Sequence, residues 1–197
     1  GDVLDFVDDV EGDEFGFGVP DAAAHVLPRR TGVYGNPYKV AVVGMGRSGS
    51  TWQFNAVRLL IAAAFPNLAL EQAHGHLPER TQLLRCLQKE NVHCVVKIHE
   101  YDEDILKNAN VVVSSARDPR DAYLSARSIF RSSIADFVTY FGYYAKWMNH
   151  ACYAMRYEDM FENPEAEVDR LATALALPAG SYNPKDIVRE IDALSAS

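Results

Sequence analysis

The sequence KVAVVGMGRSGST, residues 39–51, decides the fold of this chain. Its first part is a short apolar, β-branched run that stops at Gly44, a pattern typical of a buried parallel strand. Residues 50–65 then carry apolar side chains at helical spacing and end before Pro66. Glycines let the backbone approach a phosphate, and a helix N-terminus offers unpaired N–H groups and partial positive charge. Strand, loop and helix together predict a phosphate-binding turn.

The rest of the chain alternates in the same way. Further strands are predicted at 68–71, 93–98, 111–114 and 151–157, and helices at 78–88, from Asp118 onward, at 133–149 and at 164–176. Asp118 followed by Pro119 is typical of a helix start. The alternation predicts a three-layer α/β/α domain with a mainly parallel sheet, spanning residues 38–197. Residues 1–37, rich in Asp, Gly and Pro, are expected to form an irregular acidic segment.

Charge and cysteine content limit the classes of function. The net charge is −8, and seven of the acids lie within residues 1–20, which contain no Lys or Arg. A nucleic-acid binder needs a positive field, so no nucleic-acid partner is expected. Cys86, Cys94 and Cys152 do not suggest a disulfide framework in a chain of this length, and Cys94 is interpreted as a small buried residue. They have no metal-ligand spacing, so we predict no structural zinc.

Targeting signals are also absent from the sequence pattern. No apolar run approaches the length of a membrane span, and the N-terminus is acidic rather than basic and apolar, unlike a signal peptide. We therefore expect a cytoplasmic location. Because the chain begins at Gly1 rather than Met, a trimmed anchor or targeting segment is compatible with this sequence. The oligomeric state is not indicated.

The glycine-rich loop by itself fits more than one ligand. Gly44-x-Gly46-x-x-Gly49 matches the dinucleotide-binding pattern, with Glu71 at the distance of a ribose-binding acid. The same glycines begin a Walker A loop, although Ser50 stands where a kinase or NTPase has Lys. Dinucleotide and nucleoside-triphosphate ligands are both open at this point, and the remaining motifs decide.

Four segments resemble the sulfotransferases that use 3′-phosphoadenosine 5′-phosphosulfate (PAPS). In chain order they are GRSGSTW at 46–52, VKIH at 96–99, RDPRDAYLS at 117–125 and YEDM at 157–160. The corresponding family patterns are K/R-SGTTW, KTH, RDPRDVxxS and YED followed by Leu or Met. The resemblance implies the P-loop sulfotransferase fold, PAPS as the donor and its desulfated form, PAP, as a product.

The resemblance also implies roles for individual residues. Arg47 contacts the bridging oxygen of the donor, Ser50 and Thr51 bind its 5′-phosphate, and Trp52 stacks on adenine. Arg117 and Ser125 hold the 3′-phosphate, and Tyr157 contacts adenine. The full set of implied donor-binding residues is Arg47, Ser48, Gly49, Ser50, Thr51, Trp52, Arg117, Ser125 and Tyr157.

The implied chemistry is transfer of a sulfuryl group to a hydroxyl or amine. His99 is the implied general base, which suits an imidazole because its unperturbed pKa lies near neutrality. Arg47 and Lys97 are expected to meet the negative charge that develops on the leaving group. No metal is expected, because a sulfuryl group carries less charge than a phosphoryl group. The acceptor could be a small molecule, a carbohydrate or a peptide.

Two departures from the family pattern leave alternatives open. Nothing after Tyr157 resembles the family's RKGxxGxW loop, which closes over the 3′-phosphate, so a nucleotide-binding module without activity is one alternative. A P-loop nucleotide or small-molecule kinase is the other. An acidic stretch around Glu100 and Asp102 is interpreted as a solvated helix start. The aromatic residues of 140–147 are interpreted as a helix face packed into the core rather than an acceptor pocket.

Overall fold

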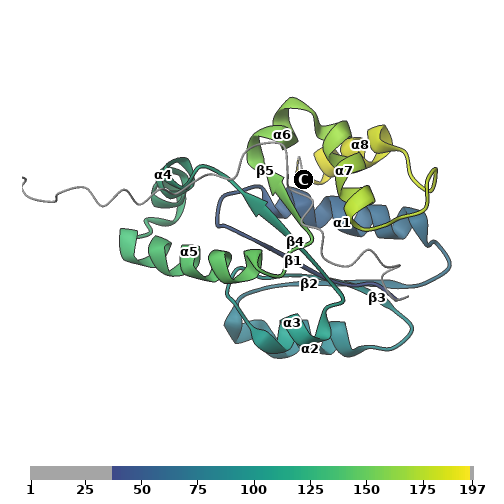
Figure 1. Ribbon diagram of the computed structural model, residues 1–197, viewed down its shortest axis with the longest axis horizontal. Helices are drawn as coiled ribbons and strands as arrows, with labels where there is room; N and C mark the ends of the chain where they lie inside the picture. The colour runs from purple at the N-terminus through teal and green to yellow at the C-terminus, as the bar shows by residue number, and fades with distance from the viewer. Residues whose placement is uncertain (1–36, 196–197) are drawn as a thin grey trace, which may run out of the picture.

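The computed structural model describes residues 37–195 and contains one five-stranded sheet (Figure 1). All pairings are parallel, and the strand order is β2-β3-β1-β4-β5. The strands are β1 (Lys39–Gly44), β2 (Leu70–His74), β3 (His93–Lys97), β4 (Val111–Ala116) and β5 (Tyr153–Arg156). Because the strands are parallel, their carboxyl ends meet at one edge, where α/β domains form their ligand sites.

Helices cover both faces of the sheet, as Figure 1 shows. Residues of β1 alternate between the two layers: Val40 and Val42 join one core cluster, and Ala41 and Val43 join the other. The first layer contains α1 (Ser50–Ala64), α6 (Tyr157–Glu162), α7 (Pro164–Ala174) and α8 (Pro184–Ser195), and the second contains α2 (Arg80–Gln88) and α3 (Glu103–Asn108). The predicted three-layer α/β/α architecture is confirmed.

Two further helices extend beside the carboxyl edge of the sheet. They are α4 (Pro119–Phe130) and α5 (Ile134–Met148), which lie at the left of Figure 1. Trp147 near the end of α5 is fully buried in the second core layer and holds that end in place. The other parts of α4 and α5 expose several large apolar side chains: Leu124, Ile129, Phe130, Ile134 and Val138.

Most predicted elements are present, with shifted ends. The helix predicted from Asp118 is α4, and the Asp118 carboxylate caps it by accepting from the Arg120 N–H at 2.8 Å. The strand predicted at 68–71 begins at Leu70 and continues to His74, since it pairs with β3 along that length. The helix α8 was not predicted. The expected boundary between the irregular segment 1–37 and the domain 38–197 falls at the first described residue, so it stays a prediction.

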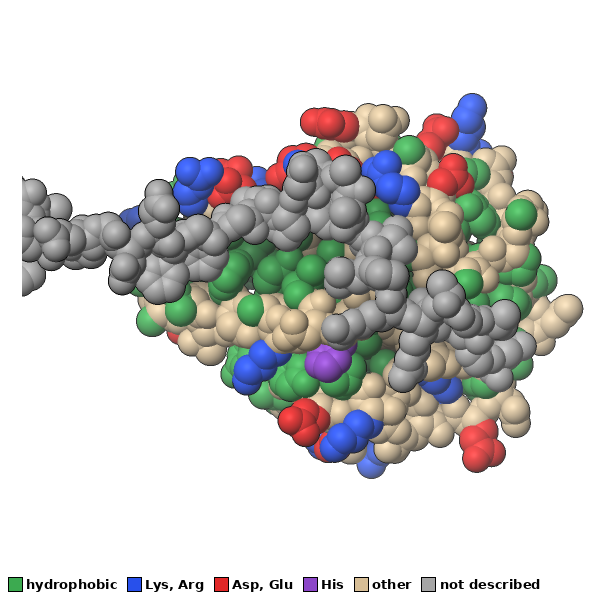
Figure 2. All heavy atoms as spheres, viewed as in Figure 1, with side chains coloured by type: hydrophobic (Ala, Val, Ile, Leu, Met, Phe, Trp, Pro, Cys, Tyr) green, Lys and Arg blue, Asp and Glu red, His purple; other side chains and the backbone are tan. Residues whose placement is uncertain are grey.

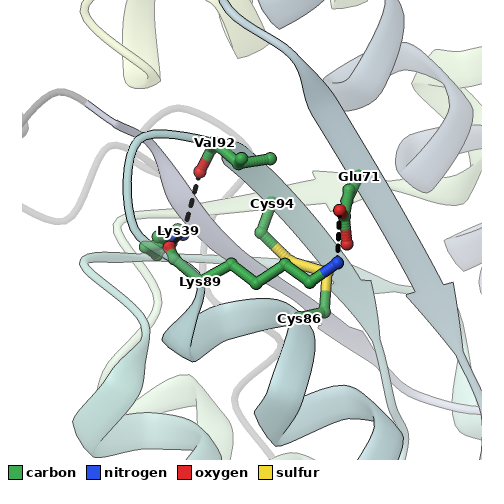
Figure 3. Close-up of a disulfide and its surroundings, with 6 residues drawn as sticks. All are labelled: Lys39, Glu71, Cys86, Lys89, Val92 and Cys94. Atoms are coloured by element: carbon green, nitrogen blue, oxygen red, sulfur yellow. Dashed lines mark hydrogen bonds and ion pairs between the residues drawn. A yellow bond between two sulfur atoms is a disulfide. The ribbon is translucent and has the colours of Figure 1, made fainter.

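The cysteine prediction is wrong for one pair. Cys86 in α2 and Cys94 in β3 form a disulfide, with Cα atoms 6.0 Å apart (Figure 3). The two residues meet because α2 packs over β3, which sequence spacing does not reveal. The bridge lies near the start of β3, and that strand reaches the site edge only at Lys97.

Within residues 37–195, no helix has both the length and the apolar character needed to cross a membrane.

Candidate active site

A cavity of about 620 Å³ opens at the carboxyl edge of the sheet. One side consists of the glycine-rich loop and the end of β3. The opposite side consists of the segment after β2 and the facing parts of α4 and α5. We call the first the donor side and the second the acceptor side. The donor side includes Gly46, Arg47, Gly49, Ser50, Thr51, Lys97, His99 and Tyr157, and the acceptor side includes His74, Gly75, His76, Phe130, Asp136, Phe137, Tyr140 and Phe141.

The loop conformation requires glycine at two of its three glycine positions. Gly49, which caps α1, has φ of 81°, and a Cβ there would lie 3.0 Å from the Met160 sulfur. A Cβ on Gly44 would clash with the side chain of Ser115 on β4. Gly46 has open space around it. Arg47 adopts φ of 67°, a strained value for a residue with a side chain, and such strain concentrates at binding loops.

Ser48 and Trp52 do not point into the cavity. The Ser48 side chain is fully buried and hydrogen-bonds the Ser115 hydroxyl at 2.7 Å and the Met45 carbonyl, so it ties the loop to β4. Trp52 is half-buried and packs against the first core layer. Both side chains therefore make structural contacts inside the protein. The roles implied for Ser48 in donor binding and for Trp52 at the adenine stay predictions.

Lys97 connects the end of β3 with the loop. Its ammonium donates to the Thr51 hydroxyl at 2.7 Å, so two predicted site residues meet directly. Burial lowers the pKa of Lys97, and the nearby Arg47 guanidinium lowers it further. The lysine thus comes to the loop from a neighbouring strand, whereas a Walker A loop carries its lysine within the loop itself.

Arg47, Arg117, Ser125 and Tyr157 come together beside the donor side. Of these four, Arg47 and Tyr157 line the cavity, and Arg117 and Ser125 contact them from outside the lining. The Arg47 Nε donates to the Ser125 hydroxyl at 3.0 Å. The Arg117 guanidinium lies over the Tyr157 ring, 4.0 Å from its centroid, and its Nη1 reaches the Arg47 carbonyl at 3.4 Å. The Arg117 Nε is buried and has no hydrogen-bond partner within residues 37–195. Three motifs distant in sequence thus form one cluster that contains two guanidinium groups, Arg47 and Arg117.

His99 lies between the donor and acceptor sides. Its Nδ1 is 2.8 Å from the Gly44 carbonyl, which can only accept, so the Nδ1 carries the proton and Nε2 is left as the base. Burial lowers the pKa of His99, the hydrogen bond to Gly44 opposes that shift, and the Lys97 charge adds to it. The imidazole is therefore neutral at neutral pH, as a general base must be.

The acceptor side contains residues that the sequence analysis did not assign. Phe137, Tyr140 and Phe141 of α5 line the cavity, so the expectation that the aromatic residues of 140–147 pack into the core is wrong for Tyr140 and Phe141. For Trp147, which is fully buried, it is confirmed. Figure 2 shows hydrophobic side chains gathered around the α4–α5 part of the molecule. The aromatic spacing was visible in the sequence, but the position of α5 beside an open cavity was not.

The acidic stretch after His99 is only in part a solvated helix start. Asp102 caps α3 by accepting from the N–H groups of Asp104 and Ile105, so the helix start is confirmed. Asp102 is nevertheless buried and paired with Arg80, so it is not solvated. Glu100 is 6% exposed and contacts His76 and Tyr140 from behind the acceptor side. For Glu100 the predicted exposure is therefore wrong, because α5 and the segment after β2 cover it.

The dinucleotide interpretation finds no support in the position of Glu71. Its carboxylate pairs with Lys89 at 2.5 Å beside the disulfide and is not among the residues that line the cavity (Figure 3). Among residues 37–195, no group of three or more His, Cys, Asp or Glu side chains is arranged to hold a metal ion.

Comparison with known proteins defines the fold. No family model matches the sequence, and no curated protein matches it. The structure is similar to a mouse sulfotransferase, SULT7A1, complexed with PAP, with a TM-score of 0.56, 12% identity, and coverage of 78% of this chain and 63% of that one. It is also similar to retinol dehydratase complexed with androsterone and PAP, with a TM-score of 0.51, 18% identity, and coverage of 81% and 66%.

These similarities show that the chain has the fold of PAPS-dependent sulfotransferases. The chain spans slightly less than two thirds of the length of either neighbour. Within the described residues, those after Tyr157 form α6, α7 and α8, which pack on the first layer and do not line the cavity.

Proposed function

We propose that this chain is a sulfotransferase that moves a sulfuryl group from PAPS to a hydroxyl or amine acceptor. The observation that carries the proposal is the convergence of His99, Lys97 and the glycine-rich loop at one cavity. His99 presents Nε2 there because the Gly44 carbonyl engages Nδ1, and Lys97 is held against the loop by Thr51. The fold shared with two PAP-complexed proteins supports the same ligand.

The proposed reaction needs in-line geometry and charge stabilisation more than covalent help. His99 Nε2 takes the proton from the acceptor as its oxygen or nitrogen attacks sulfur. Lys97, Arg47 and the N–H groups at the start of α1 stabilise the negative charge that builds on the departing phosphate. The cluster around Arg117 supplies charge for a 3′-phosphate, which distinguishes this donor from ordinary nucleotides.

Ligand-dependent stabilisation tests the donor. PAP at saturating concentration should raise the melting temperature by several degrees, because a ligand that binds only the folded state stabilises it by mass action. Adenosine 5′-monophosphate, ADP and NAD should raise it much less. Equal shifts for all four ligands would rule out PAPS as the specific donor.

Transfer from labelled PAPS tests the activity. Sulfated product from any hydroxyl or amine in an acceptor panel would separate an enzyme from a module that only binds nucleotide. A phosphorylated product that forms only with Mg²⁺ and ATP, together with no reaction of PAPS, would instead indicate a kinase.

A further inference from the structure

His76 and Glu100 form a hydrogen-bonded pair on the acceptor side of the cavity, directly beside His99. The His76 Nδ1 lies 3.0 Å from the Glu100 Oε1, and the Tyr140 hydroxyl donates to the same oxygen at 3.4 Å. The Trp147 indole donates to the Glu100 main-chain carbonyl at 3.1 Å, which fixes the backbone next to His99. The carboxylate is thus held in place from two directions.

Glu100 is poorly explained by a structural role alone. Its side chain is 8% exposed, and its Oε2 is buried with no hydrogen-bond partner within residues 37–195. An incompletely satisfied buried carboxylate is unfavourable, and an apolar residue would fill the same space without that cost. What the carboxylate does provide is an acceptor for the Nδ1–H of His76, a residue that lines the cavity.

The sheet register places His76 and His99 at neighbouring strand ends. His74 pairs with Lys97 in the parallel β2–β3 ladder, and each histidine lies two residues beyond its member of that pair. The Gly75 N–H still donates to the Lys97 carbonyl at 3.2 Å, so the strands remain adjacent there. Both histidines also line the cavity. Two imidazoles at neighbouring strand ends that line one cavity can contact two groups of one small molecule.

Both imidazoles present the same kind of atom. The Glu100 carboxylate accepts from the Nδ1–H of His76, and the Gly44 carbonyl accepts from the Nδ1–H of His99. In each ring, Nε2 is then the remaining hydrogen-bond acceptor. Phe137 and Phe141 provide an apolar aromatic wall nearby. Two acceptor nitrogens beside an aromatic wall match a flat ring with hydroxyl groups on adjacent carbons.

We infer that His76, oriented by Glu100, is a specificity-determining residue that accepts a hydrogen bond from a second hydroxyl of the acceptor, so that the site favours catechols. The attacked hydroxyl is the one at His99. This inference rests on the proposed sulfuryl transfer. Glu100 is a positioning residue, because it acts through His76.

Binding of matched phenols to the protein–PAP complex tests the inference without requiring turnover. Calorimetry would compare catechol with guaiacol, in which one hydroxyl is methylated and cannot donate. Catechol should bind about tenfold more tightly, the usual value of one hydrogen bond. His76→Ala should remove this preference, whereas His74→Ala, at another cavity histidine, should keep it. Equal affinities for catechol and guaiacol in the unaltered protein would overturn the inference.

Variants at Glu100 separate orientation from packing. Glu100→Gln keeps an oxygen that can accept from the His76 Nδ1–H, so it should keep the catechol preference. Glu100→Leu should lose the preference while PAP affinity is unchanged. Preservation of the preference in Glu100→Leu would show that the carboxylate does not position His76.

A spectroscopic measurement covers the case in which Glu100→Leu fails to fold. Nitrogen-15 NMR of the unaltered protein, at a pH where imidazole is neutral, should show the His76 proton on Nδ1. A proton on Nε2 would contradict the inference whether or not PAP binds. If the protein binds PAP and transfers the label but shows no catechol preference, only this inference is refuted. If it neither binds PAP nor transfers the label, the proposed function is refuted.

Discussion

The two sides of the cavity are built by different means. The donor side is made from loop backbone, a helix N-terminus and cationic side chains, and it is already connected by contacts such as Lys97 to Thr51 and Arg47 to Ser125. The acceptor side is made from half-buried aromatic side chains of α5 and from two histidines, one at the end of β2 and one just after it. Phosphate recognition needs fixed donors, whereas an apolar acceptor needs mainly shape and a few polar groups. The donor side should therefore respond sharply to single changes, and the acceptor side mildly.

The largest effect is expected at His99, where the two sides meet. His99→Ala should lower kcat by about 10²- to 10⁴-fold, the usual contribution of a general base, with PAP affinity nearly unchanged. Single-turnover transfer and PAP calorimetry measure the two quantities. Transfer at the unaltered rate would remove His99 from the mechanism.

The pH dependence should report the same residue. Only neutral His99 can take the proton, and burial lowers its pKa below the ordinary histidine value of 6.5. The rate should therefore rise with pH through an apparent pKa below 6.5 and be level at neutral pH. An apparent pKa above 6.5 in the pH–rate profile would be inconsistent with the buried base.

A change at Arg117 should affect the donor side alone. Arg117→Ala should weaken PAP binding by about 10- to 100-fold through the loss of charge-assisted hydrogen bonds. Binding of adenosine 5′-monophosphate, which lacks the 3′-phosphate, should change little. Arg120→Ala is the matched control, because Arg120 is 87% exposed and pairs with Asp118, whereas Arg117 packs on Tyr157 and contacts the Arg47 carbonyl. Equal losses in the two variants would contradict the assigned 3′-phosphate site.

Two glycines of the donor loop should behave differently. Gly49→Ala should destabilise the fold by about 1–3 kcal/mol, since alanine is disfavoured at φ of 81° and its Cβ would crowd Met160. Gly46→Ala should change stability by less than about 0.5 kcal/mol, because its surroundings are open. Urea denaturation measures both, and similar losses would contradict the loop conformation.

The smallest effect is expected on the acceptor side. Phe137→Leu should raise the acceptor KM by about 2- to 5-fold, through loss of part of an apolar contact, and leave the KM for PAPS unchanged. Val138→Ala, at the next position of α5, is 62% exposed and absent from the cavity lining, so it serves as the control. A larger effect on PAPS than on the acceptor would contradict the division into two sides.

The donor side was largely predictable because its signals are local. Gly49 and its helix, the Asp118 cap and the strand ending at Lys97 are each encoded within a few residues, and the structure has all three. The side-chain directions of Ser48 and Trp52 were not predictable, because they depend on contacts with β4 and the first core layer. The ends of β2 likewise depend on pairing with β3.

The sequence by itself determined a three-layer α/β/α domain with a glycine-rich turn between its first strand and first helix, because hydrophobic periodicity and glycine placement act over short distances. Only the tertiary structure decided that Cys94 meets Cys86, that Glu100 is buried, and that His76 lies beside His99. Each of these depends on which surfaces of α2, α5 and the β2–β3 pair pack together. Such contacts join residues distant in the chain and leave no local pattern in the sequence.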